Sequence, residues 1–499
     1  MDPSTIRTDW LDRQALYHGD RAAVEWRPTG ETLTFADLDR QSAALAAALG
    51  ERFGMRKGDR VAVLSENSLE HVLLFAACQK AGFVLVPLNF RLTGPELAYL
   101  VSDADPTVLF VSDEHADAVA FAGPTEPLDT VRQLAAGGGT WQGERPTLDD
   151  ALLILYTSGT TGRPKGAIYT HGMLVWNAVN TVHRLSLTPA DVSFNAAPFY
   201  HTGGWNVLLT PFLFTAGRTI LLDRFDADGL LRLCDDEGIT ILWGVPTMLQ
   251  MMAESDTFEA VSLGTVRYAV VGGEPMPAPL TRTWQAKGVP IRQGFGMTEV
   301  GVNCFSLPEA DAVRKMGSIG FPNLFVDIRI VDANGRDVTP GETGELVFRG
   351  PVVTPGYWRN PEATAKAFTA DGWFRSGDLV RQDDEGYVYV VGRLKEMYIS
   401  GGENVYPAEV EAVLREHPAV AEAAVVGVPD DRWGEAGVVF LVPAGPAPDA
   451  AALVDFCRQR LAAYKVPREI RWLDALPVGH SGKIQKTDLV ALATTAPAS

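Results

Sequence analysis

The stretch YTSGTTGRPKG, residues 156–166, gathers residue types that bind phosphate oxygens. Its hydroxyls and backbone N–H groups are donors, its glycines allow a ligand to approach the backbone closely, and Lys165 adds a positive charge. The stretch is not the nucleotide-binding pattern GxxxxGK[ST], and the later SGKIQK at 481–486 does not fit that pattern either. The sequence therefore predicts a phosphate-binding loop of another kind, with a polar surface turn as the competing interpretation.

Further short stretches combine glycines with aromatic or charged residues in the same way. They are FYHTGG (199–204), GFGMTE (294–299), RSGD (375–378) and GRLKE (392–396). Each holds a side chain that could bind a ligand beside backbone that could approach one closely.

The elements around the first stretch predict a parallel α/β sheet. Residues 32–49 predict a helix with Thr34 as N-cap and Asp37 three residues later, and 68–82 predict a second helix that ends at Gly82. Apolar runs at 59–67, 83–89, 106–113 and 151–158 alternate with the helical segments, as buried parallel strands do. Ligand loops in such sheets follow the carboxyl ends of strands, which is where YTSGTTGRPKG lies. Segment 113–150 predicts an irregular surface excursion.

The pattern changes from residue 325 onward. Residues 326–350 alternate and carry turn dipeptides, and residues 371–393 predict a hairpin that turns at Asp384, Glu385 and Gly386. A helical pattern at 408–418 and an apolar run then follow. The last hundred residues therefore predict a small α+β domain, with its boundary near Arg393–Glu396.

Composition narrows the class of protein. A chain of 499 residues is too long for one compact core, so we expect two or more domains. The formal charge of −19, from 43 basic and 62 acidic residues, argues against nucleic acid as a partner. The four cysteines lie far apart without a CxxC pair, which indicates neither a zinc knuckle nor a disulfide framework. The charged N-terminus and the short apolar runs predict a cytoplasmic protein without stable membrane insertion.

Together these motifs, in this order, resemble the adenylate-forming superfamily of acyl-CoA synthetases, adenylation domains and luciferases. The resemblance runs from TLTFADLDR at 32–40 to GKIQK at 482–486. It implies an α/β fold whose large N-terminal domain, 1–392, has parallel-rich sheets and a small β-barrel-like part. A hinge at 393–396 and a small mobile α+β domain at 397–499 would follow.

The resemblance also implies a role for each motif residue. The ATP phosphates would bind Thr157, Ser158, Gly159, Thr160, Thr161, Gly162 and Lys165, and Mg²⁺ would bind Glu299 and Thr157. Adenine would lie against Phe295 and against Gly273, Glu274 and Pro275 of the GGEP run (272–275), and the ribose would bind Asp378 and Arg393. The catalytic residues would be Lys483, His201 and Thr298, the pantetheine arm of coenzyme A would pass Gly401 and Gly402, and Lys395 would be the hinge pivot. Five of these roles have a structural alternative that involves no ligand, called the bland alternative below. It is a core aromatic for Phe295, a core histidine for His201, an ion pair for Asp378 and Arg393, a surface helix residue for Glu299, and a solvated lysine for Lys483.

The implied reaction has two steps. A carboxylate displaces pyrophosphate from MgATP to give an acyl-adenylate, and the thiol of coenzyme A then displaces AMP. A lysine cation at position 483 would offset the repulsion between the two anionic reactants.

The predicted acid pocket favours an apolar substrate. Its pieces, Phe199–Trp205, Val271–Glu274 and Gly294–Val302, contain no Lys or Arg to pair with a second carboxylate, and the first has no aspartate for an amino-acid ammonium. A fatty acid is the preferred substrate, and an aromatic acid of the hydroxycinnamate or benzoate type is the alternative. An enzyme that loads a separate carrier protein, a luciferase-like oxygenase and a non-enzymatic nucleotide-binding protein remain competing classes. The sequence leaves open whether the protein is a homodimer.

Overall fold

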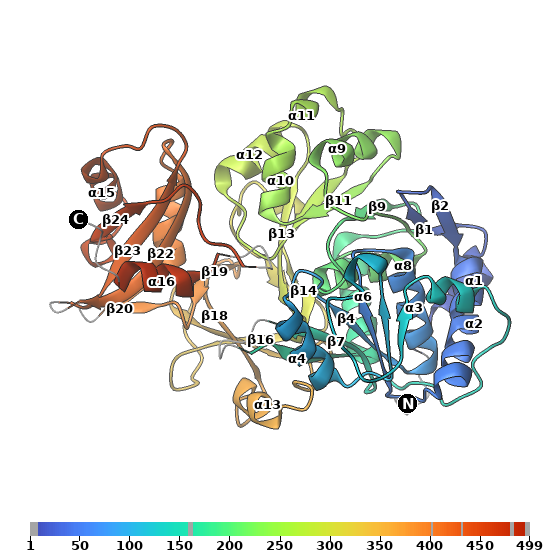
Figure 1. Ribbon diagram of the computed structural model, residues 1–499. Coiled ribbons are helices and arrows are strands. Elements are labelled where there is room, and N and C mark those ends of the chain that lie inside the picture. Colours follow the sequence, from blue (N-terminus) through green and yellow to red (C-terminus); the bar gives the residue numbers. More distant parts are fainter. Residues whose placement is uncertain (1–7, 158–162, 401–402, 431–432, 480–483, 495–499) are drawn as a thin grey trace. The chain divides into compact units, whose positions relative to one another are not determined.

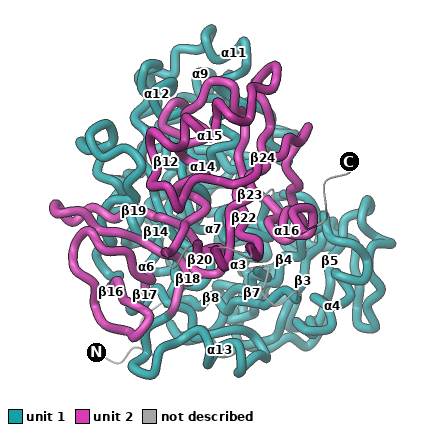
Figure 2. The backbone as a smooth tube through the Cα atoms, turned by 90° about the vertical axis from the view of Figure 1, so that its left-hand side faces the viewer, with its two compact units in different colours: residues 1–276, 280–328, 348–374 teal, residues 277–279, 329–347, 375–499 magenta. Residues whose placement is uncertain are grey.

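The computed structural model describes residues 8–157, 163–400, 403–430, 433–479 and 484–494. The chain divides into two compact units (Figure 2). Unit 1 comprises residues 1–276, 280–328 and 348–374, and unit 2 comprises 277–279, 329–347 and 375–499. These units are defined by packing, whereas the predicted hinge at 393–396 concerns motion, so that hinge and the division at residue 392 stay predictions.

The first sheet of unit 1, of which Figure 1 labels β4 and β7, confirms the predicted parallel arrangement. Its strand order is β6-β5-β3-β4-β7-β8, and all neighbours run parallel except the antiparallel pair β7–β8. The bounds are β3 (Arg60–Leu64), β4 (Val84–Leu88), β5 (Val108–Val111), β6 (Thr125–Pro127), β7 (Ala151–Thr157) and β8 (Lys165–Thr170). The strands β3, β4 and β5 are buried on both faces, which explains their continuous apolar sequences.

The helices near this sheet begin and end as their capping residues predict. Thr34 and Asp37 form a capping box at the start of α2 (Phe35–Phe53), and Gly82 ends α3 (Leu69–Ala81) with φ +69°. Segment 113–150 is more ordered than its composition predicts, because it contains the edge strand β6 and α5 (Thr130–Ala135). The remaining elements here are α1 (Leu11–His18), α4 (Gly94–Ala104) and η2 (Asp113–His115).

Two more sheets complete unit 1. One has the order β2-β1-β10-β9 and the other the order β11-β12-β13-β14-β15, in which β11, β12 and β13 are parallel. Their bounds are β1 (Ala22–Trp26), β2 (Glu31–Thr34), β9 (Val192–Asn195), β10 (Arg218–Leu221), β11 (Ile241–Gly244), β12 (Tyr268–Val271), β13 (Ile291–Met297), β14 (Gly301–Ser306) and β15 (Phe321–Pro322). The helices are α6 (His171–Leu185), α7 (Thr202–Asn206), α8 (Leu209–Thr215), α9 (Ala227–Asp236), α10 (Pro246–Ala253), α11 (Asp256–Ala260), α12 (Ala278–Ala286) and α13 (Pro361–Ala367), with η3 (Thr298–Val300) and η4 (Glu309–Asp311).

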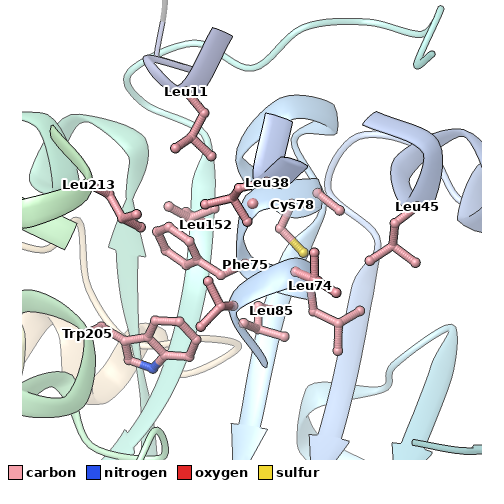
Figure 3. Packing of buried hydrophobic residues seen from close by; sticks show 14 of the residues in the cluster. Leu11, Leu38, Leu45, Leu74, Phe75, Cys78, Leu85, Leu152, Trp205 and Leu213 are labelled. Carbon is pink, nitrogen blue, oxygen red and sulfur yellow. The ribbon is translucent and has the colours of Figure 1, made fainter. Parts of the chain in front are cut away.

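The largest core cluster joins the first sheet to the segment after β9 (Figure 3). Leu74 and Phe75 of α3, Leu85 of β4 and Leu152 of β7 are fully buried in it. Phe75 stacks on Trp205 of α7 with ring centroids 5.0 Å apart. This packing fixes α7, and with it the FYHTGG stretch, against the sheet that carries the phosphate-loop strands.

Unit 2 holds most of a four-stranded sheet and the whole of the C-terminal α+β region. The four-stranded sheet has the order β16-β17-β18-β19, with bounds β16 (Asp327–Val331), β17 (Thr343–Arg349), β18 (Phe374–Gln382) and β19 (Val388–Arg393). The predicted hairpin is confirmed, because β18 and β19 pair antiparallel through a turn in which Gly386 has φ +87°. Among the described strands this sheet is open, so the expected barrel-like part is not a closed barrel.

The C-terminal sheet has the order β21-β20-β23-β22, with β24 parallel to β23. Its elements are β20 (Tyr398–Ser400), β21 (Glu403–Val405), α14 (Pro407–Arg415), β22 (Val420–Asp430), β23 (Gly434–Pro443), α15 (Ala450–Arg458), η5 (Ala463–Lys465), β24 (Glu469–Trp472) and α16 (Lys486–Thr494). All four cysteines of the chain are buried and unpaired. Within the described ranges, no helix has the length and hydropathy needed to cross a bilayer.

Candidate active site

The predicted phosphate loop begins and ends at one point of the first sheet. Thr157 is the last residue of β7, Lys165 is the first of β8, and the two are paired across the antiparallel ladder. The Thr157 hydroxyl donates to the Lys165 carbonyl at 3.4 Å, and both residues are half-buried. The strand predicted before the loop is confirmed. The predicted loop residues Ser158, Gly159, Thr160, Thr161 and Gly162 lie outside the described residues.

Glu299 lies in a tight turn between two antiparallel strands. The turn is η3, which joins β13 to β14, and Gly301 closes it with φ +80°. A β-carbon at Gly296 would lie 2.2 Å from the Val302 carbonyl oxygen, so only glycine fits the strand before the turn. Glu299 is 5% exposed, and its backbone carbonyl accepts a hydrogen bond from the Thr354 N–H at 2.7 Å. The predicted catalytic residue Thr298 is the half-buried neighbour of Glu299.

Tyr357 joins the phosphate-loop strand to the Glu299 turn. Its hydroxyl donates to Glu299 Oε1 at 3.0 Å, and Lys165 Nζ lies 5.3 Å from the centre of its ring. Burial, and then the nearby Glu299 carboxylate, raise the pKa of Tyr357. Lys165 and Glu299, predicted from separate motifs, are thus brought to one place. The sequence offered only a Gly-Tyr-Trp run at 356–358, which names no partner.

The carboxyl ends of three neighbouring parallel strands are rich in glycine. Gly244 ends β11, Gly272 and Gly273 follow β12, and Gly294 lies at the end of the parallel part of β13. Crevices at the carboxyl ends of parallel strands are the usual ligand sites of α/β sheets. Gly272 and Gly273 leave the backbone accessible to a ligand, whereas Gly244 is buried against Leu249.

Phe295 and the GGEP stretch lie at these strand ends. Phe295 is half-buried, edge-on to Phe305 with centroids 6.0 Å apart, and nearly parallel to Phe348 at 6.3 Å. It is therefore partly a core aromatic, as its bland alternative holds, yet it retains accessible area for a base. Gly273, Glu274 and Pro275 are exposed.

Gln293 fastens the GGEP stretch to β13, and sequence reasoning missed it. Its amide nitrogen donates to the carbonyl oxygens of Val271 at 3.3 Å and Glu274 at 3.2 Å. Its amide oxygen accepts from the Met276 N–H at 3.1 Å. A polar amide residue directly before GFGMTE, at the end of the parallel part of β13, was the available signal.

His201 lies just before α7, in a segment held by a buried amide. Asn67 donates from Nδ2 to the Ala197 carbonyl at 2.9 Å and accepts from the Phe199 N–H at 3.1 Å. His201 is half-buried and its ring lies 4.7 Å from that of Tyr200. It is thus neither a fully buried core histidine nor a fully exposed one.

Gly203 and Gly273 face apolar side chains of the β11 region. A β-carbon at Gly203 would lie 3.4 Å from the Trp243 ring, and one at Gly273 would lie 3.5 Å from Val245. The predicted pocket segments therefore meet an indole and a valine side chain rather than a charged group.

Buried asparagines connect α7 with the strand that follows Glu299. Asn303 of β14 donates to the Thr181 hydroxyl at 2.7 Å and to the Asn206 carbonyl at 3.2 Å. Asn177 of α6 donates to the same Asn206 carbonyl at 2.8 Å. Buried polar groups with satisfied hydrogen bonds specify one arrangement of the elements that carry them. Sequence reasoning missed this network because its members lie on three separate elements.

Unit 2 brings together two other predicted site residues. Asp378 is 2% exposed and Arg393 Nε lies 2.7 Å from its Oδ1. The two residues are cross-strand partners in the β18–β19 ladder. The ion pair of the bland interpretation is therefore present, and ribose binding by this pair stays a prediction.

Lys395 lies in an exposed hydrogen-bonded turn. The N–H groups of Glu396 and Met397 both donate to the Arg393 carbonyl, at 3.0 and 3.1 Å. The predicted site residues Gly401, Gly402 and Lys483 lie outside the described residues.

Lys486, three residues after Lys483, is a half-buried cation. It forms ion pairs with Glu411 at 2.8 Å and with Glu396 at 3.0 Å. Burial alone would lower its pKa, but the two carboxylates outweigh burial and raise it. This ion-pair cluster ties the start of α16 to the end of the Lys395 turn.

Comparisons with known proteins cover nearly the whole chain. Residues 11–358 match the family described as AMP-binding enzyme, and residues 409–483 match the AMP-binding enzyme C-terminal domain. A feruloyl-CoA synthase of Amycolatopsis sp is 42% identical, with 96% of this chain and 97% of that protein covered. An indoleacetate–CoA ligase of Aromatoleum aromaticum is 39% identical, with 97% of each covered. A long-chain-fatty-acid–CoA ligase of Mycobacterium tuberculosis is 35% identical, with 96% and 97% covered.

Solved structures agree with this similarity. ATP-bound MatB from Rhodopseudomonas palustris superimposes with a TM-score of 0.89 at 34% identity, covering 98% of this chain and 99% of that one.

Proposed function

Since the chain belongs to the AMP-binding enzyme family, we propose that it is an acid–thiol ligase that activates an aromatic carboxylic acid with ATP and transfers the acyl group to coenzyme A. The reaction class rests on relatives that are named as CoA ligases or a CoA synthase and that match this chain along nearly their whole length.

The relatives favour an aromatic acid over the fatty acid preferred from the sequence. The relatives at 42% and 39% identity are named for acids that contain an aromatic ring, whereas the relative named for a long-chain fatty acid is 35% identical. A fatty acid remains the second candidate, since the predicted pocket segments hold no Lys or Arg and suit either kind of apolar acid.

The donor set in unit 1 fits Mg²⁺. Mg²⁺ in nucleotide sites binds one or two carboxylates together with substrate phosphates, and Glu299 and Thr157 offer a carboxylate and a hydroxyl. We assign the ion to these oxygens and to the phosphates of ATP. Within the described part of the chain, no group of three or more His, Cys, Asp or Glu residues could hold a metal. When bound, Mg²⁺ would neutralise phosphate charge and polarise the phosphorus–oxygen bonds.

The first half-reaction would take place between two anions. A carboxylate oxygen of the acid attacks the α-phosphorus of ATP, the bond from that phosphorus to the bridging oxygen breaks, and pyrophosphate leaves with its electron pair. We assign Lys165 and the loop hydroxyls to the phosphates, and Lys483 to the charge that develops at the α-phosphate. His201 and Thr298 would border the acid carboxylate and the α-phosphate. Phe295 and the GGEP stretch would hold adenine, and Asp378 with Arg393 the ribose.

In the second half-reaction the thiol of coenzyme A would add to the acyl carbonyl and AMP would leave. The thiol loses its proton to solvent as the carbon–sulfur bond forms, and the acyl–phosphate bond breaks with its electrons on AMP. We place pantetheine at Gly401 and Gly402, and the turn between the half-reactions at Lys395 within the predicted hinge 393–396, so that residues 397–499 would move as one domain.

A panel of acids tests this function. Purified protein with MgATP is offered ferulate, cinnamate, indoleacetate, benzoate and C8 to C16 alkanoates, and pyrophosphate and AMP are measured with and without coenzyme A. We expect aryl acids to give the highest kcat/KM and AMP release to require coenzyme A. A higher kcat/KM for an alkanoate would favour the second candidate. If AMP release required a carrier protein instead of coenzyme A, the acyl acceptor would be that carrier protein.

A further inference from the structure

Residues 354–358, here called the strap, bind the phosphate-loop strand on one side and the Glu299 turn on the other. The Ile168 N–H donates to the Gly356 carbonyl at 3.1 Å, and the Trp358 N–H donates to the Gly166 carbonyl at 2.7 Å, so the strap extends the edge of β8. Thr354 donates from its hydroxyl to the Ile168 carbonyl at 2.7 Å. The strap thus fixes the spacing between β8 and η3.

The Tyr357 side chain spans the same two elements. Its ring lies beneath Lys165 Nζ, and its hydroxyl donates to Glu299 Oε1 at 3.0 Å. Its backbone N–H is held in turn by the Thr364 hydroxyl at 2.9 Å. One side chain, anchored at its backbone, therefore contacts both the cation and the carboxylate.

The Tyr357 hydroxyl has an effect on the Glu299 carboxylate that the Tyr357 ring does not have. Glu299 is 5% exposed, and a buried carboxylate needs charge-assisted hydrogen bonds to stay ionised and in one orientation. The donor at Oε1 restricts rotation of the carboxylate group. Phenylalanine at the same place would keep the packing beneath Lys165 and lose only that restriction.

We propose that Tyr357 is a positioning residue that orients the Glu299 carboxylate toward the Mg²⁺–phosphate site and holds Lys165 over the face of its ring. The inference rests on the proposed function, because it presumes that MgATP is the nucleotide bound here. Tyr357 itself touches no reacting atom in this mechanism.

The test compares Tyr357→Phe with the matched variant Tyr389→Phe. Tyr389 is also half-buried and its hydroxyl also donates to a carboxylate, Asp383 Oδ2 at 3.4 Å, near the turn of the β18–β19 hairpin in unit 2. Calorimetry measures the Kd of ATP with Mg²⁺ and with EDTA, and pyrophosphate release is titrated against free Mg²⁺. Thermal melts of all variants show that the proteins are folded.

For Tyr357→Phe we expect the Mg²⁺ concentration for half-maximal rate and the Kd of MgATP to rise about tenfold, while the Kd of ATP in EDTA changes little. Tyr389→Phe should leave the Mg²⁺ dependence at the wild-type value. In the Glu299→Gln background, Tyr357→Phe should add less than twofold, because its effect passes through the carboxylate.

Two results would overturn the positioning role. One is a wild-type Mg²⁺ titration for folded Tyr357→Phe, and the other is a full tenfold effect that persists in the Glu299→Gln background. If the wild-type protein binds MgATP but releases no pyrophosphate with any acid, the proposed function fails and the binding comparison still decides the role of Tyr357.

Discussion

Alanine at Gly296 should damage the Glu299 turn, whereas alanine at Gly294 should be tolerated. The two glycines flank Phe295 on β13. A β-carbon at Gly296 would lie 2.2 Å from the Val302 carbonyl oxygen and 2.4 Å from that of Gly301, both of them backbone atoms. At Gly294 the nearest atom would be the Phe305 carbonyl oxygen at 3.5 Å, an ordinary contact. The pair thus separates a steric effect from the general cost of losing a glycine.

The size of the effect follows from these distances. Relief of the overlap at Gly296 requires the backbone of the turn to move by about 1 Å, and overpacking of this kind costs about 1–3 kcal/mol. At about 2–4 °C per kcal/mol for a domain of this size, the melting temperature should fall by roughly 2–12 °C. A displacement of about 1 Å at Glu299 should also lower the rate of adenylate formation about 100-fold.

The assay joins a thermal melt to pyrophosphate release with the best acid of the panel. For Gly294→Ala we expect a melting temperature within about 2 °C of wild type. If Gly296→Ala had the melting temperature of Gly294→Ala and released pyrophosphate at the wild-type rate, the close approach of β13 and β14 would not be what places Glu299, and the argument from Gly296 would be wrong.

Four further changes test other parts of the site. Glu299→Gln should raise the Mg²⁺ requirement of pyrophosphate release, and wild-type kinetics at limiting Mg²⁺ would remove it as a ligand. Lys483→Ala should lower acyl-adenylate formation about 100-fold or more, while transfer from supplied acyl-AMP to coenzyme A survives; equal losses would contradict its role. Lys395→Pro, which fixes φ, should impair one half-reaction far more than the other, and proportional losses with a lower melting temperature would argue against a hinge. Burial lowers the pKa of His71 from 6.5 to about 3, so the unfolded chain binds the proton first and stability is lost as pH falls from 6.5 toward 3. At pH 5 this loss is about 2 kcal/mol, and melts at pH 7 and pH 5 should show a smaller fall for His71→Gln than for wild type.

Local signals in the sequence predicted the elements well because they act over a few residues. The capping box of Thr34 and Asp37 lies within one helical turn, and Gly386 occupies a hairpin turn that requires positive φ. The strand before the phosphate loop was likewise readable from one apolar run. By contrast, the edge strand β6 lies in a segment rich in Gly and Pro, and only pairing with β5 makes it a strand.

The contacts that assemble the site could not be predicted in this way. Tyr357 and Glu299 are 58 residues apart, and Asn303 and Thr181 are 122 residues apart. Periodicity and capping carry no information on which distant side chains meet, so the sequence could identify Glu299 and Lys165 as candidates but not their common neighbour. The resemblance supplied roles for single residues, and the packing between them had to come from the fold.

The strap has a consequence for how the protein is made. Its Thr354 hydroxyl reaches a partner 186 residues earlier in the chain. At synthesis rates of about 5–20 residues per second, β8 would wait about 10–40 s before the strap can pair with its edge. During that interval the ribosome-bound chain presents an unpaired strand edge, the kind of edge on which chains associate wrongly. The nucleotide site is therefore among the last parts of unit 1 to form, and a chain arrested before residue 354 would hold much of the core without the means to close that site.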